Sequence, residues 1–159
     1  MAGIGQPPGS GPRQHPDEGR LVQPSTGVEQ PLRWAVVQVA LDPAIGHEQA
    51  GTRRVLVVSY EPFHRSGLST VCPITAARSD YRYPGDVPIQ VGVAGQTRPG
   101  VILCQQLRTI STDRIVRDEH TGGIVLHYLS DPELRAAVRR AVSHHLGLDI
   151  PAVSDGAVG

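Results

Sequence analysis

The chain has 159 residues, with fifteen basic and fifteen acidic side chains and a formal net charge of zero. This length predicts one domain plus a tail, and the balanced charge excludes a histone-like polycation. The chain has only two cysteines, Cys72 and Cys104, which excludes a disulfide-rich scaffold and fits two buried small hydrophobic residues. No cluster of Cys and His has the spacing of a zinc site. No apolar run approaches the roughly 20 residues needed to cross a bilayer.

Arginine supplies all fifteen basic side chains, because the chain contains neither lysine nor asparagine. One explanation is GC-rich codon usage. The other is functional, since every guanidinium can grip a phosphate with two parallel hydrogen bonds. Both explanations stay open at this point.

The two ends of the chain differ from its middle in composition. Residues 1–31 are rich in Gly, Pro, Gln and Ser, which predicts a disordered N-terminal tail, and residues 149–159 predict a flexible C-terminal tail. Residues 32–148 are then the predicted folded domain. The N-terminus has no apolar stretch of signal-peptide type, which favours a cytoplasmic protein.

The predicted strands are short and rich in valine and isoleucine. In chain order they cover Arg33–Leu41, Arg54–Ser59, Leu68–Ile74, Asp86–Val93, Val101–Ile110 and Ile124–Tyr128. A long loop, Asp42–Arg53, separates the first two, and a turn is expected over Glu61–Gly67. Pro73 predicts that the third strand ends there or lies at an edge.

One helix follows the strands. Ser130 to Glu133 reads S-x-x-E, a capping box with proline in the first turn, and Gly147 fits a left-handed C-terminal stop. The apolar face consists of Leu134, Ala137, Val138, Ala141, Val142 and His145, and the solvent face of Arg135, Arg139 and Arg140. The chain therefore predicts an α+β fold, a small antiparallel barrel with a helix packed on it.

The long loop carries a dense polar group, in which His47, Glu48 and Arg53 lie beside glycines that allow close backbone approach. An imidazole, a carboxylate and a guanidinium within seven residues suit acid–base chemistry on a phosphodiester; an ordinary solvated loop is the alternative. Residues 53–108 hold seven arginines against three acids, a net of +4, which suits a polyanion partner or is simply a mixed surface.

The loop also carries a family resemblance. Asp42–Arg53 (DPAIGHEQAGTR) closely resembles the D-P-x-x-G-x-E-Q-x-G-x-R signature of MazF/PemK-type toxins. The likeness returns at Cys72–Thr75 (CPIT) and Gln106–Ile110 (QLRTI), and it covers about Arg33 to Leu148. It implies an SH3-like antiparallel β-barrel with a C-terminal helix, a fold shared with the gyrase poison CcdB.

The resemblance implies the toxin component of a type II toxin–antitoxin system. Such toxins are homodimers that cut single-stranded RNA (mRNA, rRNA or tRNA) at selected sequences without a metal or other cofactor, and a cognate antitoxin protein blocks them. Their reaction is attack by the 2′-hydroxyl, which leaves a cyclic phosphate and a 5′-hydroxyl. The alternative is a non-nuclease binding module on the same fold, such as a CcdB-like gyrase inhibitor. An adaptor domain without a polyanion ligand is a third, weaker interpretation.

Catalysis of this kind needs no protein nucleophile. It needs groups that remove a proton, stabilise a phosphorane-like dianion and help the 5′-oxygen leave. The resemblance assigns charge stabilisation to Arg53 and donation to a phosphate oxygen to Thr75. Glu48 is the simplest candidate base, or a salt-bridge partner that positions Arg53. His47, which the PemK/Kid branch shares, is an auxiliary base or an RNA contact.

RNA contacts are expected from Gln49, Arg54, Arg82, Gln106 and Arg108, since amide and guanidinium groups read the edges of splayed-out bases. For Arg108 the alternative is a fold-stabilising ion pair. Arg82 follows a tyrosine and precedes another in a loop that contacts RNA or the antitoxin, or is only solvated.

Several positions depart from the family pattern. Leu103 and Gln105 stand where the Kid branch has an Arg and an Asp, so the full Kid-type set is absent. Trp34 and Ala35 stand where Gly-Asp often opens the first strand, and Arg54 replaces the usual proline.

Overall fold

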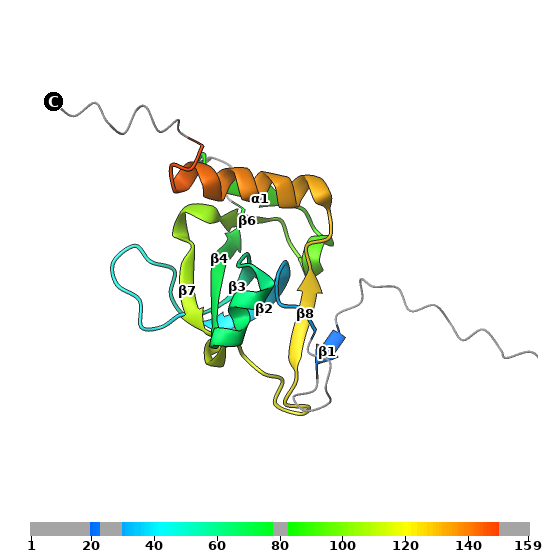
Figure 1. Cartoon of the computed structure of the whole chain (residues 1–159). Helices are drawn as coiled ribbons and strands as arrows, with labels where there is room; N and C mark the ends of the chain where they lie inside the picture. The colour runs from blue at the N-terminus through cyan, green and yellow to red at the C-terminus, as the bar shows by residue number, and fades with distance from the viewer. Residues whose placement is uncertain (1–19, 23–29, 78–82, 150–159) are drawn as a thin grey trace, which may run out of the picture.

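The computed structural model describes residues 20–22, 30–77 and 83–149 (Figure 1). Within these ranges the chain forms eight strands, four short 3₁₀ helices and one α-helix. In chain order they are β1 (Arg20–Val22), β2 (Ala35–Ala40), β3 (Thr52–Val57), η1 (Glu61–Ser66), β4 (Leu68–Ala76), β5 (Asp86–Ile89), η2 (Val93–Gly95), β6 (Gly100–Leu103), η3 (Cys104–Gln106), β7 (Arg108–Ser111), η4 (Thr112–Arg114), β8 (Ile124–Tyr128) and α1 (Pro132–His145). None of the helices in the described ranges is both long and apolar enough to cross a lipid bilayer.

The strands form one antiparallel sheet with the order β1-β8-β2-β3-β4-β6-β5, and β7 pairs with the first part of β4. An isolated bridge joins Val39 of β2 to Ile115, which follows η4. The sheet therefore curls toward closure, although its ladder does not run continuously around a barrel. The predicted α+β class, with a small antiparallel β structure and a C-terminal helix, is confirmed (Figure 1).

Ala35–Val37 of β2 and Val55–Val57 of β3 are buried on both faces, which explains why these halves of the two strands are continuously apolar. On one face Val36 and Leu56 belong to a core cluster that includes Val138 of α1. On the other face Val37 and Val55 belong to a second cluster beneath the curled strands. Helix α1 covers the first cluster and lies across one end of the sheet (Figure 1).

Helix α1 begins one residue later than the capping box predicts. Asp131 rather than Ser130 is the N-cap, and its carboxylate accepts the backbone N–H of Glu133 at 2.8 Å. Gly147 ends the helix with φ +68°, as predicted. His145 is exposed, so its placement on the apolar face is wrong, because the helix reaches the edge of the core before its last turn.

The predicted single strand over Val101–Ile110 is two strands, β6 and β7, separated by η3. The break arises because β4 changes partner along its length: β7 pairs with Leu68–Val71 and β6 with Ile74–Ala76. Pro73 lies between the part of β4 that pairs with β7 and the part that pairs with β6. Its missing N–H therefore removes no hydrogen bond to either strand, and β4 continues to Ala76. The expectation that this strand ends at Pro73 is therefore wrong.

Three smaller differences concern local turns and ends. The segment expected as a turn at Glu61–Gly67 is the 3₁₀ helix η1, closed by Gly67 at φ +80°. Strand β5 ends at Ile89 instead of Val93, because η2 follows. Residues 20–22, within the predicted N-terminal tail, form β1 and pair with β8.

Trp34 has a left-handed backbone conformation, with φ +68°. Glycine adopts this conformation without steric cost, which explains why a glycine suits the position. In this chain neighbours hold Trp34 in place: its N–H donates to the Val57 carbonyl at 2.8 Å, and its carbonyl accepts the Leu129 N–H at 2.8 Å. Its ring is buried in the core cluster beneath α1.

Candidate functional site: an arginine-lined cavity where two strands part

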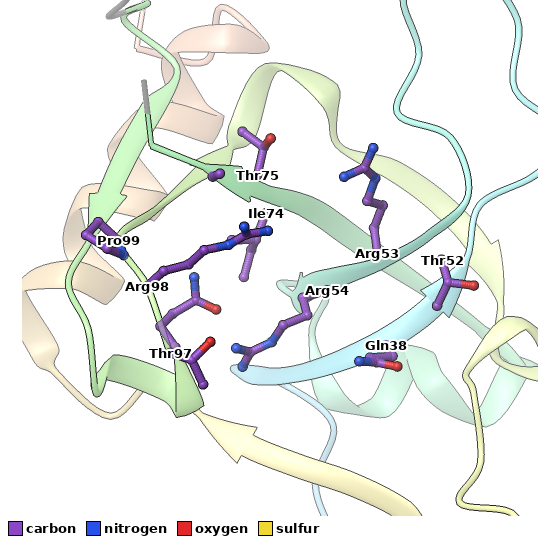
Figure 2. A pocket seen from close by; sticks show the side chains of 11 residues that line it. Gln38, Thr52, Arg53, Arg54, Ile74, Thr75, Thr97, Arg98 and Pro99 are labelled. Carbon is purple, nitrogen blue, oxygen red and sulfur yellow. The ribbon is translucent and has the colours of Figure 1, made fainter. Parts of the chain in front are cut away.

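A cavity of about 370 Å³ opens where β3 and β4 separate (Figure 2). On β3, the pairing with β4 covers only Val55–Val57, whereas the pairing with β2 continues as far as Thr52, and β4 pairs with β6 from Ile74 onward. The two strands thus diverge as they leave the core. The residues that line the space are Gln38, Thr52, Arg53, Arg54, Ile74, Thr75, Ala76, Gln96, Thr97, Arg98 and Pro99.

Arg53 and Thr75 face each other across this cavity. The ladder pairs Val55 with Pro73, and continuing that register by two residues places Arg53 opposite Thr75. Side chains two residues apart share a face of a strand, so both project to the same side, as Figure 2 shows. Arg53 is exposed and its Nε–H donates to the Ala50 carbonyl at 2.9 Å, while Thr75 is half-buried.

Arg54, the residue expected to contact RNA beside Arg53, instead anchors one wall of the cavity. Its guanidinium donates to the carbonyls of Gly95 (2.8 Å) and Ala94, at the end of η2. The side chain is half-buried, and this burial lowers the pKa of Arg54 from its ordinary value. His127 lies close to the same turn, and its pKa is lowered by burial and by the charge of Arg54.

The turn that leads into β6 forms another wall of the cavity, and it contributes residues that the sequence did not predict. Arg98 extends from this turn into the space between β3 and β4, and Thr97 lies beside it (Figure 2). The triplet Arg98-Pro99-Gly100 marked the turn in the sequence, but nothing local indicated that it faces Arg53. Three arginines thus line the cavity, and none of its described lining residues is acidic.

The two candidate bases do not line the cavity. His47 is exposed in the loop between β2 and β3. Glu48 is also exposed, and its carboxylate accepts the Ile45 N–H at 3.0 Å. Within the described residues no ion pair joins Glu48 to Arg53, so the salt-bridge alternative for Glu48 receives no support.

The loop is tied down at two points. The Gly51 N–H donates to the Asp42 carboxylate at 2.9 Å, which closes the base of the loop. The Gln49 N–H donates to the side-chain oxygen of Gln106 in η3 at 3.1 Å. This hydrogen bond joins Gln49 and Gln106, two residues that are predicted to contact RNA. It uses the Gln106 side-chain oxygen, so the amide NH₂ of Gln106 is left as a donor.

Arg108 and Arg82 complete the predicted set. Arg108 donates to the Leu41 carbonyl at 3.4 Å, and within the described residues it forms no ion pair. Arg82 lies outside the described residues.

The positions that depart from the Kid-type pattern have structural roles. Leu103 is buried in β6, and the Gln105 side chain donates to the Asp86 carboxylate at 2.9 Å. Cys72 and Cys104 are buried and free, as predicted, and a hydrogen bond with Cys104 together with burial raises the pKa of the Cys72 thiol. In the described parts of the chain, no three His, Cys, Asp or Glu side chains are grouped so as to hold a metal ion.

The fold is a curled antiparallel sheet with a C-terminal helix, and its cavity, lined by arginines and hydroxyl groups, has the charge that suits an anionic ligand. A family model described as "PemK-like, MazF-like toxin of type II toxin-antitoxin system" matches residues 32–145. The chain belongs to this family.

Curated relatives carry the same family's names. Endoribonuclease PemK of Escherichia coli is 40% identical over 92 residues, which is 57% of this chain and 66% of that protein. Endoribonuclease EndoA of Bacillus subtilis (strain 168) is 38% identical over 76 residues, 47% of this chain and 66% of that protein. The chain thus spans just under two thirds of the length of these relatives.

Solved structures share the fold. MazF from Deinococcus radiodurans superposes with a TM-score of 0.58 at 25% identity, over 74% of this chain and 96% of that one. Mycobacterium tuberculosis toxin MazF-mt6 gives a TM-score of 0.54 at 24% identity, over 72% of this chain and 98% of that one.

Proposed function

We propose that this protein is the toxin of a type II toxin–antitoxin system and that it cuts single-stranded RNA in the cavity between β3 and β4. The observation that carries the proposal is the position of Arg53 opposite Thr75 in a cavity with three arginines and no described acidic lining residue. Membership of the toxin family and the endoribonuclease names of its relatives support the same activity.

The scissile phosphate lies between Arg53 and Thr75 in this proposal. Arg53 uses its Nε–H on the Ala50 carbonyl, which fixes the side chain and leaves its two Nη groups for two phosphate oxygens. The Thr75 hydroxyl donates to a phosphate oxygen. As the 2′-hydroxyl attacks, negative charge builds on the phosphorane, and these preoriented donors stabilise it.

Arg98 adds a third donor from the opposite wall. Because it reaches into the same space, it holds either the scissile phosphate or the next phosphate along the strand. Arg54 maintains the wall through its two backbone contacts and acts on RNA only through the shape of the cavity.

The general base comes from the loop between β2 and β3. We assign this role to His47 ahead of Glu48, because one oxygen of the Glu48 carboxylate already accepts the Ile45 N–H. An imidazole ring nitrogen can also accept a proton, which a base for the 2′-hydroxyl must do. His47→Ala should then remove more activity than Glu48→Gln, and the reverse order would move the role to Glu48.

The partners follow from the family. A solved MazE–MazF structure from Deinococcus radiodurans, with a TM-score of 0.54 at 25% identity, supports a cognate antitoxin protein for this toxin. We further infer a homodimer in the cytoplasm, where its RNA substrate lies. Light scattering after size exclusion measures the first, and fractionation the second.

The deciding experiment incubates purified protein with single-stranded RNA, with and without EDTA, and maps the new ends. We expect cleavage in both conditions, a 5′-hydroxyl on one product and a cyclic phosphate on the other. Intact RNA in both conditions would overturn the proposal. Inhibition of gyrase supercoiling by a protein that leaves RNA intact would favour the CcdB-like alternative.

A further inference from the structure

Three arginines surround one buried indole at the end of the sheet covered by α1. The guanidinium carbons of Arg33, Arg135 and Arg139 each lie 5.4 Å from the centre of the Trp34 ring. Arg135 and Arg139 come from successive turns of α1, and Arg33 comes from the residue just before Trp34. We call these three side chains the Trp34 arginine cluster.

Cation–π contacts with the ring offset part of the repulsion between the three charges. The Glu61 carboxylate accepts the backbone N–H groups of Leu32 and Arg33, and the Asp131 carboxylate accepts the Glu133 N–H. Among the described residues, the ion pairs involve His64 with Glu61 and His144 with Asp149, so neither neutralises a cluster arginine. The Nε of Arg33 is buried without a hydrogen-bond partner in the described part of the chain. The cluster is therefore a concentrated positive charge with an unused donor.

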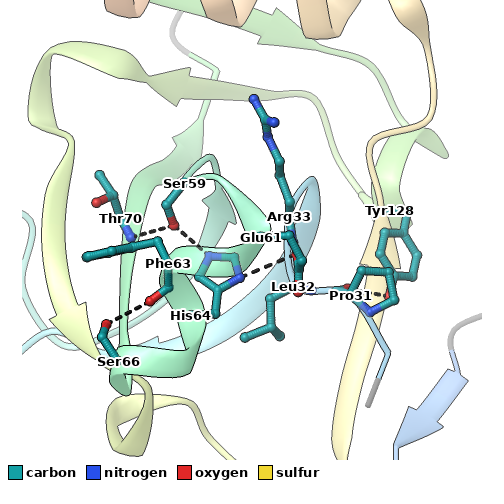
Figure 3. Close-up of polar contacts among 10 residues, drawn as sticks. All are labelled: Pro31, Leu32, Arg33, Ser59, Glu61, Phe63, His64, Ser66, Thr70 and Tyr128. Atoms are coloured by element: carbon teal, nitrogen blue, oxygen red, sulfur yellow. Dashed lines mark hydrogen bonds and ion pairs between the residues drawn. The ribbon is translucent and has the colours of Figure 1, made fainter. Parts of the chain in front are cut away.

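The geometry of the cluster is fixed before any ligand arrives. The Nε–H of Arg135 donates to the Leu129 carbonyl at 2.5 Å, and Trp34 itself is held at both its backbone groups. Arg139 is exposed, so at least one guanidinium is open to a large ligand. Figure 3 shows the Arg33 side chain extending away from the hydrogen-bonded group of Ser59, Glu61 and His64. A preorganised set of planar donors is suited to phosphate oxygens.

An exposed aromatic ring adjoins the cluster. Tyr60 is 66% exposed, and the Arg33 guanidinium carbon lies 5.9 Å from the centre of its ring. An exposed ring beside arginines is the combination that holds single-stranded nucleic acid, since the ring stacks on a base while the guanidinium binds the neighbouring phosphate. An acidic peptide would use the arginines but would have no use for the ring.

We propose that the Trp34 arginine cluster and Tyr60 form a second RNA-binding surface, separate from the cleavage cavity. This inference rests on the proposed function, because it concerns the same RNA substrate. Trp34 directly precedes β2, and the cavity residue Gln38 lies within β2 four residues further on, a span of at most about 13 Å. A strand of RNA that occupies the cavity reaches the second surface with its flanking nucleotides, so long substrates are held at two points.

The test compares Tyr60→Ala and Arg139→Gln with Arg140→Gln, an exposed arginine of the same helix that is outside the cluster. Both exposed test positions keep the core intact, and thermal unfolding verifies this. We expect KM for a long RNA to rise about tenfold in Tyr60→Ala, because one lost stacking contact is worth about that factor. KM should also rise in Arg139→Gln, because a phosphate contact is lost, and kcat should be unchanged in both variants. A short RNA that fills only the cavity should be cut by all variants at the wild-type rate.

Binding of a non-cleavable 2′-O-methyl RNA, followed by fluorescence anisotropy, gives a readout that does not need cleavage. Arg139→Gln should reduce the slope of log affinity against log salt by about 0.7, the value for one phosphate contact on a single strand, and Arg140→Gln should not. Equal KM values and equal salt slopes for all variants would overturn the second surface while leaving cleavage intact. Loss of antitoxin binding in Arg139→Gln with unchanged RNA binding would also overturn it, in favour of an acidic protein ligand. Wild-type protein that binds this RNA through the cluster but cleaves no RNA would instead contradict the proposed function.

Discussion

Arg53 and Thr75 lie opposite each other two register positions beyond the last pair of the β3–β4 ladder. The ladder holds the two backbones in alignment up to Val55 and Pro73, and the strands then diverge with different partners. The positions of the two side chains along the strands are therefore fixed relative to each other, while the space between them is free for a ligand. Strand pairing positions the pair although their backbones are no longer bonded.

Removing either member of this pair should nearly abolish RNA cleavage without unfolding the protein. Arg53→Ala and Thr75→Ala each remove one donor to the phosphorane, and loss of such a donor costs about 10²- to 10³-fold in rate. Single-turnover cleavage of a labelled RNA measures the effect. Thr75→Ser keeps the hydroxyl and should retain most of the activity, which separates loss of the donor from a change in packing.

If Thr75→Ala and Thr75→Ser cut at equal rates, the hydroxyl is not a donor in the reaction. If Arg53→Ala cuts at the wild-type rate, the catalytic arginine lies elsewhere, and Arg98 is the next residue to replace.

Arg54→Ala should destabilise the fold far more than Arg53→Ala. The change at Arg54 leaves the carbonyls of Gly95 and Ala94 without their donor, at a cost of about 1–3 kcal/mol, whereas Arg53 is exposed and its loss should stay within about 0.5 kcal/mol. Urea unfolding of both variants gives the comparison. Equal stabilities would mean that Arg54 does not anchor this wall.

Two glycines form a matched pair: Gly92, which directly precedes η2, and Gly95, which is its last residue. Gly95 has φ +72°, and a Cβ there would lie 2.6 Å from the His127 ring, whereas Gly92 has φ +85° and open space. Alanine at either position bears the left-handed backbone cost, about 1–2 kcal/mol. Gly95→Ala must also displace the His127 ring, which adds about 1–3 kcal/mol.

Gly95→Ala should also lower the RNA-cleavage activity more than Gly92→Ala does, because the Gly95 carbonyl anchors Arg54 at the cavity wall. Gly92→Ala should leave the cleavage rate near wild type, and Gly95→Ala should lower it. A Gly92→Ala variant that is as unstable as Gly95→Ala would contradict the role given to His127.

Glu61 should make the protein sensitive to acid. Partial burial alone would raise the pKa of Glu61, but the N–H groups of Arg33 and Leu32, together with His64, hold it below its ordinary value. A carboxylate of this kind stabilises the fold above its unfolded pKa of about 4.3, and the contribution is lost as the pH falls through the lower folded value.

Urea midpoints measured from pH 7 down to pH 3 should therefore fall less steeply in Glu61→Gln than in wild type. Glu119→Gln, at an exposed position, serves as the control and should keep the wild-type profile. The same acid slope in all three proteins would show that Glu61 is not linked to stability.

The strands of this fold could be predicted because their valine-rich sequences are buried, and the helix because its cap, periodicity and glycine stop are local signals. The break at η3 could not, since Val101–Ile110 contains no glycine or proline to mark it and only the change of partner along β4 divides it. Arg53 and Thr75 were predicted by the family resemblance. Their alignment depends on register, and the entry of Arg98 depends on a turn distant in sequence from both.

In the loop between β2 and β3, nearness in the sequence does not predict nearness in the structure. His47 and Glu48 stand within a few residues of Arg53 in the chain, yet they lie outside the cavity that Arg53 lines. Nearness in sequence does not determine the direction of a side chain in a loop, where no period fixes the faces. The hydrogen bonds of Asp42 with Gly51 and of Gln49 with Gln106 determine it instead.

The left-handed conformation of Trp34 limits how this chain can drift in sequence. Glycine at this position would relieve the backbone, but it would empty the space of an indole and bring three guanidinium groups together with nothing between them. Neutral residues in place of the arginines would leave a tryptophan in a strained conformation without its cation contacts. Each change alone is unfavourable, so the indole and its arginines form an evolutionary unit that is exchanged as a whole or kept.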